Sequence, residues 1–265
     1  MVSKSLKTDD FEIRSMKSPL DGKLFQVILT LFTERRSYLF MELKENLMPK
    51  AAWTQDKINN TKEKILDVAL KLIIEEGFNK LSMRKIASRL GITAANIYNY
   101  YSSKDEINLM IRVRGFEMLF SLLSKEYRKK TALQNRIKAL VWAYVNFGIT
   151  YPGYYDLMFN LHTPKYIDYM GTVLEPVAAF EKATAMKNFH LIAGIIKELI
   201  GARDNHEALI RDINIQLWSD LHGIISLFNS HVLAEVDENS KEALQRRVNN
   251  LIEQLTTVKH TFRMI

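Results

Sequence analysis

The sequence contains no cysteine, which excludes disulfide bonds, cysteine-ligated zinc sites and thiol nucleophiles together. It also has no apolar run near the ~18 residues that a membrane-spanning helix needs, because the best candidate, residues 24–32, is followed at once by the charged Glu34. Only ten glycines and five prolines interrupt the 265 residues. These absences predict long, uninterrupted helices or strands in a protein of the cytoplasm, with no membrane partner.

The sequence motifs of common enzyme classes are missing as well. The chain carries no nucleophile elbow, no glycine-rich phosphate loop and no His-Glu-x-x-His motif. Two short groups, residues 204–207 and 220–222, contain side chains that can bind metals, but isolated groups of this kind usually face solvent or cap helices. We therefore predict no catalytic residue, no metal site and no cofactor.

The composition is that of an ordinary globular protein, with 47% hydrophobic and 25% charged residues, so one large domain or two modest ones are expected. The net charge of +7 suits a polyanionic partner such as a nucleic acid. Counted by region, the excess is about +1 over residues 1–47, +3 over 48–110 and +3 over 111–265. Charge alone therefore permits a nucleic-acid partner and does not identify a basic surface.

Apolar residues recur at three- and four-residue spacing almost everywhere, which predicts an all-α fold. Four residues are predicted to cap helices, namely Thr61, Ser82, Thr93 and Ser103, and the first two helices are expected to end at Gly77 and Gly91. The helix that follows Thr93 is expected to run to about Tyr100. Further helices are expected at residues 133–150, 153–161, 167–180, 186–200, 207–234 and 240–260.

Residues 1–58 form a predicted N-terminal extension with two possible origins. Residues 24–43 have the pattern of an amphipathic helix, which fits an accessory arm. Met48 begins a short polar segment that leads into the Thr61 helix, which fits an alternative initiator preceded by an over-long start. The sequence leaves both readings open.

Residues 82–101 have the pattern of a helix-turn-helix, with a tight turn at residues 91–93 between two short helices. In the second of these helices Ile97 and Tyr101 share an inward face, and the outward face is formed by Ala94, Ala95, Asn96, Tyr98 and Asn99. Small side chains at 94 and 95 allow the start of this helix to approach base edges in the major groove, and Asn96 offers both a donor and an acceptor to adenine. A plain three-helix core does not explain why alanine and asparagine occupy the outward face.

Several polar side chains around this helix are candidates for contacts to DNA. Tyr98 and Tyr100 carry hydroxyls that can donate to phosphates, and Lys104 adds its charge to the positive end of the next helix. Ser82 stands at the start of the preceding helix, where hydroxyl and backbone amides suit a phosphate, and Arg84 can reach a guanine.

Residues 59–119 resemble the DNA-binding domain of the TetR family of bacterial transcriptional regulators. The resemblance rests on Thr61–Ile65, Glu76–Phe78, Ser82–Ala87, Leu90–Thr93, Ile97-Tyr98, Tyr100-Tyr101 and Ser103-Lys104. It implies a homodimer whose two helix-turn-helix units bind a palindromic operator. Carried over to this chain, the base contacts are expected from Ala94, Ala95, Asn96 and Arg84, and the backbone contacts from Ser82, Thr93, Tyr98, Asn99, Tyr100 and Lys104.

Residues 120–265 resemble, less closely, the C-terminal effector-binding and dimerisation domain of TetR proteins with a Trp-His-Gly signature. The matching residues are Trp218, His222 and Gly223, with a second match at residues 144–159. A glycine inside a helix costs about 1 kcal/mol relative to alanine, so we expect a partner helix or a ligand to approach Gly223 closely. His222 has two readings, a core histidine satisfied by a backbone or hydroxyl partner, or a ligand contact.

A set of aromatic and methionine residues in this region can line an apolar effector pocket or simply fill the core. The main pocket candidates are Trp142, Phe147, Tyr151, Tyr155, Phe159, Trp218 and His222, and Tyr154, Met158, Met170, Met186 and Phe189 belong to the wider set. The last two long helices have the pattern of a dimer's four-helix bundle.

Together these features predict a DNA-binding regulator of the TetR type. The resemblance implies a repressor that binds a palindromic operator as a homodimer and is released by a small-molecule effector. An architectural or partner-controlled DNA-binding factor without an effector remains the alternative. A ligand that binds the protein and abolishes operator binding would distinguish the two.

Overall fold

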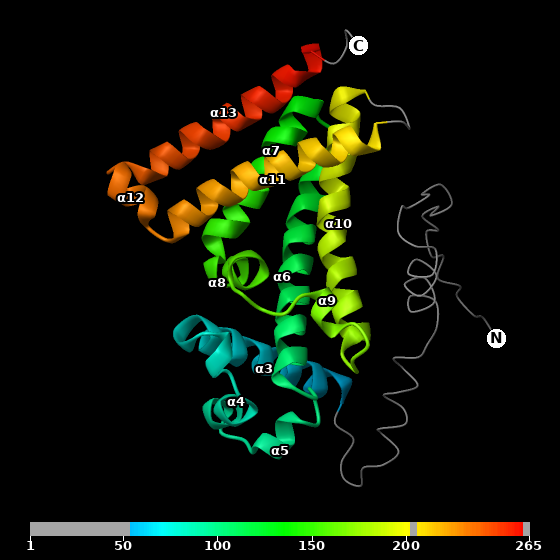
Figure 1. Cartoon of the computed structure of the whole chain (residues 1–265), viewed down its shortest axis with the longest axis vertical. Helices are drawn as coiled ribbons and strands as arrows, with labels where there is room; N and C mark the ends of the chain where they lie inside the picture. Colours follow the sequence, from blue (N-terminus) through cyan, green and yellow to red (C-terminus); the bar gives the residue numbers. More distant parts are fainter. Residues whose placement is uncertain (1–53, 202–205, 262–265) are drawn as a thin grey trace, which may run out of the picture. The chain divides into compact units, whose positions relative to one another are not determined.

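The computed structural model describes residues 54–201 and 206–261, and within these ranges the regular secondary structure is entirely helical (Figure 1). This confirms the predicted all-α fold. The predictions for residues 1–53, including the amphipathic helix and the initiator at Met48, lie outside the described residues. No described helix is long and apolar enough to span a bilayer.

The first helices form a small three-helix domain: α3 (Gln55–Glu76), the 3-10 turn η1 (Phe78–Lys80), α4 (Met83–Leu90) and α5 (Ala94–Ile97). Ser82 caps α4 by accepting from the Lys85 amide, and Thr93 caps α5 by accepting from the Asn96 amide. Gly91 ends α4 with φ of 68°, a left-handed conformation that glycine adopts without strain.

Two sequence predictions in this domain were wrong. Thr61 does not cap a helix, because α3 begins about two turns earlier, with Thr54 at its N-cap, and the Thr61 hydroxyl donates to the Lys57 carbonyl inside the helix. The α-helix after Thr93 ends at Ile97 rather than near Tyr100. The amides of Asn99 and Tyr100 bond three residues back, which is the tighter 3-10 pattern common at helix ends.

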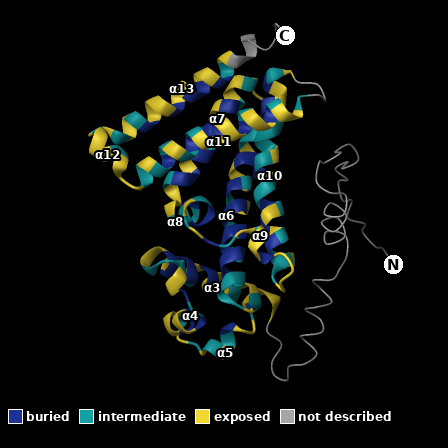
Figure 2. Cartoon of the chain, in the orientation of Figure 1, coloured by how far each residue is buried: buried dark blue, intermediate teal, exposed yellow. Residues whose placement is uncertain are grey.

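The core of this domain contains the predicted inward residues. Ile97 is fully buried and Tyr101 nearly so, and both pack with Ile65, Ile86 and Ile107. The outward positions of α5 are exposed or half-buried (Figure 2). The short α5 is therefore held by its buried side on α3, α4 and the start of the next helix.

The larger domain contains α7 (Leu133–Thr150), α8 (Pro152–Tyr155), the π-helical turn η2 (Asp156–Asn160), α9 (Tyr166–Tyr169), α10 (Glu175–Ile200), α11 (Glu207–Asn229), α12 (Val232–Val236) and α13 (Ser240–Thr261). The expected helices at 133–150 and 240–260 agree with α7 and α13. The expected helices at 167–180 and 186–200 do not, because α10 runs unbroken from 175 to 200. No glycine or proline interrupts residues 181–186, whereas Gly171, with φ of 76°, separates α9 from α10.

The predicted helix at 207–234 is also divided. His231 adopts the left-handed conformation with φ of 63°, and this residue separates α11 from α12. The predicted helix at 153–161 begins at Pro152, where proline suits the first helical position, and ends in η2.

The long helix α6 (Lys104–Tyr127) belongs to both cores. Near its start Ile107 and Ile111 are buried with α3, α4 and α5, and farther along Phe116, Leu119 and Leu123 are buried with α7, α10 and α11. The predicted boundary between the domains, at residues 119–120, falls inside this continuous helix. Any movement of α6 is thus shared by the two domains.

Candidate DNA-binding surface and ligand cavity

The candidate base contacts lie on or next to the exposed side of α5. Ala95 and Asn99 are exposed, whereas Ala94 and Asn96 are half-buried. Tyr98 is 52% exposed, which is unusual for a large aromatic side chain next to a core residue. The α5 surface therefore presents small side chains beside one projecting phenol.

The remaining candidates surround α5 on neighbouring helix starts. Arg84 is exposed in the first turn of α4, after the Ser82 cap. Lys104 begins α6 and holds its amine 4.9 Å from the centre of the Phe78 ring. Tyr100 is half-buried and packs its ring partly against the core.

Two other basic residues of α4 are already paired with acidic residues of α3. Lys85 lies 2.5 Å from Glu76 and Arg89 lies 3.0 Å from Glu75. The Lys85 pair lowers the pKa of the Glu76 carboxyl. These pairs tie α4 to α3, so they fix the helix that braces α5.

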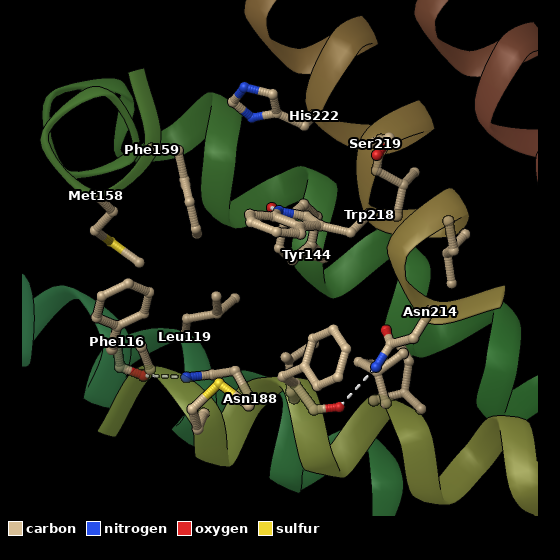
Figure 3. Close-up of a pocket in the computed structure, with 18 of the residues that line it drawn as sticks. Phe116, Leu119, Tyr144, Met158, Phe159, Asn188, Asn214, Trp218, Ser219 and His222 are labelled. Carbon is tan, nitrogen blue, oxygen red and sulfur yellow. Dashed lines mark hydrogen bonds between the residues drawn. The ribbon is translucent and has the colours of Figure 1, made fainter. Parts of the chain in front are cut away.

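A separate cavity of about 480 Å³ lies in the larger domain, a size typical of small-molecule sites (Figure 3). Its wall is mostly apolar and is built by α6, α7, η2, α10 and α11, with Lys165 just before α9. The lining residues are Arg112, Phe116, Leu119, Leu123, Leu140, Val141, Tyr144, Met158, Phe159, Lys165, Ala185, Met186, Asn188, Phe189, Ile192, Asn214, Leu217, Trp218, Ser219, Leu221 and His222.

Of the seven main pocket candidates, the structure brings Phe159, Trp218 and His222 together on this wall. Met158, Met186 and Phe189 of the wider set lie there too. The other four candidates do not line the cavity. Phe147 is fully buried in the core, Tyr151 lies at the surface against the Phe147 ring, Trp142 packs against the core, and Tyr155 is buried behind His222.

A chain of hydrogen bonds connects this wall to the core behind it. The Trp218 indole donates to the Tyr144 hydroxyl at 3.0 Å, the hydroxyls of Tyr144 and Tyr155 are 3.4 Å apart, and the Tyr155 hydroxyl lies 2.9 Å from Nδ1 of His222. An indole nitrogen can only donate a hydrogen bond, so Tyr144 is the acceptor of the first one. Both hydroxyl protons are then satisfied if Tyr144 donates to Tyr155 and Tyr155 donates to Nδ1 of His222. His222 is therefore a histidine with a hydroxyl partner and, at the same time, part of the cavity wall.

The titration of these groups agrees with a neutral network. Burial lowers the pKa of His222, and the nearby Asp156 opposes this only in part. Burial raises the pKa of Tyr144 to about 12 and raises that of Tyr155 further. A neutral imidazole is the form whose Nδ1 can accept a hydrogen bond.

Two asparagines add polar groups to the wall, Asn188 from α10 and Asn214 from α11, where it lies one turn before Trp218 (Figure 3). The Asn214 amide donates to the Phe189 carbonyl at 2.9 Å, and the Asn188 amide donates to the Phe116 carbonyl at 3.1 Å. The Asn188 Oδ1 atom is buried and has no hydrogen-bond partner among the described residues. A buried acceptor without a partner is costly unless a donor reaches it, which suits a ligand-binding wall.

A charged cluster lies at the end of the cavity nearest α9. Arg112 of α6 and Glu181 of α10 form an ion pair at 2.7 Å, with exposed fractions of only 5% and 2%. Arg112 also donates to the Pro164 carbonyl at 3.1 Å. Lys165 is exposed at the rim, and desolvation together with the charge of Arg112 lowers the pKa of its amine.

Sequence reasoning missed the charged and amide residues of this wall. Buried polar residues interrupt the apolar faces of three helices: Asn108 and Arg112 on α6, Glu181, Thr184 and Asn188 on α10, and Asn214 on α11. That interruption of the helical pattern was a usable signal, but it does not reveal which helices meet. Within residues 54–201 and 206–261, no group of three potential ligands could hold a metal ion.

Comparison with known proteins places both regions in one family. Residues 65–109 match the family model described as bacterial regulatory proteins, tetR family, and residues 137–251 match that of the tetracyclin repressor-like C-terminal domain. The Trp-His-Gly subtype is not confirmed by these matches and stays a prediction.

Individual relatives are transcriptional regulators. The chain is 27% identical over 100 residues to the HTH-type transcriptional regulator YobS of Bacillus subtilis, covering 38% of this chain and 52% of YobS. It is 21% identical over 184 residues to the HTH-type regulator Rv0681 of Mycobacterium tuberculosis, covering 68% of this chain and 75% of that protein. The match thus spans about half of YobS and three quarters of Rv0681.

The fold agrees with a solved structure of a tetR-family regulatory protein from Rhodococcus RHA1. The TM-score is 0.57 at 16% identity, over 73% of this chain and 96% of that one. The helix-turn-helix, the larger helical domain and both family matches lead to one conclusion: the chain is a transcriptional regulator that belongs to the TetR family.

Proposed function

We propose that this protein represses transcription by binding a palindromic operator as a homodimer, and that a small molecule in the cavity releases it. The observation that carries the proposal is the continuity of α6. Its first residue, Lys104, follows the α5 unit directly, and three turns later Phe116 lines the cavity. A ligand that shifts α6 at Phe116 would therefore act on the helix that supports the DNA-binding domain.

The side chain of Arg114, on α6, provides a second connection between the cavity and the DNA-binding domain. Arg114 donates to Glu63 at 2.6 Å and to Asp67 at 2.7 Å, both on α3, and lies over the Tyr154 ring of α8. Tyr154 is four residues before Met158, which lines the cavity from η2. Movement of η2 on ligand binding is expected to reach α3 through these contacts.

On DNA, α5 is proposed to enter the major groove. Ala94, Ala95, Asn96 and Arg84 are assigned to base edges, and Ser82, Thr93, Tyr98, Asn99, Tyr100 and Lys104 to the sugar-phosphate backbone. The exposure of Ala95, Asn99, Tyr98 and Arg84 supports this division. Half-buried Tyr100 and Lys104 would reach phosphates only with the ends of their side chains.

The homodimer is proposed to form through α11 and α13. Leu227 is exposed on α11, one turn after Gly223 on the same face of the helix. A Cβ atom added at Gly223 would have no heavy atom within 4 Å. This open space supports the approach of a partner helix, one of the two occupants expected from the sequence.

The test is a footprint of the purified chain on the DNA around its own gene. Protection of a palindrome, with half-sites about one helical turn or a multiple apart, is expected. Equal binding to random competitor DNA at moderate salt would contradict the proposal, because nonspecific affinity is largely electrostatic. The alternative, an architectural or partner-controlled factor, predicts that every compound that binds the protein leaves the footprint intact.

A further inference from the structure

Among the residues that line the cavity, the formal charges have one sign. Arg112 and Lys165 are basic, and the lining set contains no aspartate or glutamate. Glu181 lies behind the wall and balances one of the two cations through its ion pair with Arg112. An apolar cavity with a net positive end disfavours a cationic ligand, which would have to leave water with no carboxylate on the wall to receive it.

The two basic groups differ in their availability. Arg112 is held by Glu181 and by the Pro164 carbonyl. The amine of Lys165 is held less tightly. Among the described residues its one hydrogen bond is to the Thr163 hydroxyl at 3.5 Å, and Asp168 accepts from the Lys165 backbone amide rather than from the amine. The charges of Glu181 and Asp168 act on the amine without a direct bond to it. The amine of Lys165 is therefore the group that can turn toward an anion at the rim.

The other end of the cavity is suited to a hydrocarbon. Leu123, Leu140 and Ile192 line it, and all three are purely apolar. The hydroxyl, indole and imidazole groups of Tyr144, Trp218 and His222 are already engaged with one another or with Tyr155. Burial of an apolar body here contributes roughly 25 cal/mol for each Å² removed from water.

From this distribution we infer that the effector is an amphiphilic anion, with an apolar body in the cavity and a carboxylate-like head at Lys165 beside Arg112. This inference rests on the proposed role of the cavity as the effector site and specifies the chemical class of the effector. The head would lie beside the Arg112–Glu181 pair, which joins α6 to α10. Binding of the anion would thus perturb α6 at a point one turn before Phe116.

The inference is tested with three probes of equal chain length: decanoate, decan-1-ol and decylammonium. Binding to the full-length protein is measured by calorimetry without DNA. Decanoate is expected to bind at least tenfold more tightly than decylammonium, with the alcohol in between. The inference is overturned if decylammonium or the alcohol binds as tightly as decanoate, or if none of the three binds.

The variant Lys165→Met keeps the length of the side chain and removes its charge at an exposed position, so it should fold normally. It is expected to weaken decanoate about tenfold and to leave the alcohol within twofold. Lys138→Met is the matched control, because Lys138 is an exposed lysine of α7 that does not line the cavity. An equal loss in both variants, or no loss in Lys165→Met, would also overturn the inference.

DNA release is measured separately, by a mobility shift of the footprinted duplex with each probe. Tight, Lys165-dependent decanoate binding without release would leave the ligand class standing and contradict the proposed function. Release by a compound that needs no anionic head would support the proposed function and contradict the ligand class.

Discussion

At the residue scale, the proposed function assigns Asn96 to a base edge and Tyr98 to the DNA backbone. Asn96 lies in α5 and Tyr98 is its C-cap, so the two side chains point to different sides, and Tyr98 is the more exposed of the two. Asn96→Ala is expected to cost ~1–3 kcal/mol at one base step and to relax the choice of base there. Tyr98→Phe is expected to weaken binding to all sequences by about tenfold, because it removes a hydrogen bond to a charged phosphate.

These two variants are compared by titrating the operator and its single-base variants at constant salt. The same loss of affinity and of base preference in both variants would contradict the division of roles. Circular dichroism provides the control for folding, since neither side chain belongs to the buried core.

The ion pair of Arg112 and Glu181 provides a second prediction at this scale. Burial raises the pKa of Glu181, and the charge of Arg112 opposes that rise, so the carboxylate depends on its partner. Arg112→Met should destabilise the fold by ~3–5 kcal/mol because it leaves a buried charge without a counterion. The double variant Arg112→Met with Glu181→Met should recover most of that loss, as measured by urea denaturation, and additive losses would refute the coupling.

At the scale of elements, the close approach of α6 and η2 is the feature with functional consequences. Gly115 lies where an added Cβ would be 2.6 Å from the Met158 sulfur and 3.1 Å from a ring carbon of Tyr154. The Met158 sulfur belongs to a flexible side chain that can yield, and Met158 lines the cavity. A methyl group at position 115 would therefore displace the Met158 side chain of η2 at the cavity wall rather than press on rigid backbone.

Gly115→Ala is accordingly expected to change ligand affinity several-fold while leaving the melting temperature nearly unchanged, since the gain in helix propensity offsets the displacement of Met158. The matched control is Gly148→Ala on α7. Its Cβ would be 2.7 Å from Ile225 and 3.1 Å from Tyr155, side chains of the packed core, so it should destabilise the fold. Calorimetry measures the ligand affinity of the two variants, and thermal unfolding measures their melting temperatures. Equal changes in Gly115→Ala and Gly148→Ala would contradict the proposed role of the contact between Gly115 and Met158.

At the scale of the whole molecule, the proposed homodimer depends on the exposed surface of α11. Leu227 is 44% exposed on α11, and Ile167 is 74% exposed on α9, which the proposed interface does not include. Leu227→Arg is expected to give a monomer, with a mass of 30.8 kDa in light scattering, because the variant dimer would bury a charge against the partner subunit. Ile167→Arg should leave the mass of the dimer unchanged in light scattering.

Operator binding should weaken in step with the loss of the dimer, since each half-site is bound by one subunit. A Leu227→Arg protein that stays dimeric would move the interface away from this part of α11. A wild-type protein that is monomeric at micromolar concentration would refute the homodimer itself.

The sequence by itself determined the local features of the DNA-binding domain. Caps at Ser82 and Thr93, the turn at Gly91 and the inward pair Ile97 and Tyr101 follow from interactions within a few residues, so they can be read from spacing. The family followed from the same local patterns. The errors concerned helix boundaries, at Thr61, at the end of α5, in residues 167–186 and at His231, because local sequence patterns specify the ends of helices less well than their existence.

Only the tertiary structure decided which residues form the cavity. Phe147 and Phe159 are equally apolar in the sequence, yet one is enclosed by the core and the other faces the cavity, because the crossing of α7, η2 and α11 sets their surroundings. The ion pair of Arg112 and Glu181 joins positions that are far apart in the chain. The hydrogen bonds of Asn188 to Phe116 and of Tyr155 to His222 also join distant positions. Such contacts depend on how helices pack in space, which the helical periodicity of each segment does not specify.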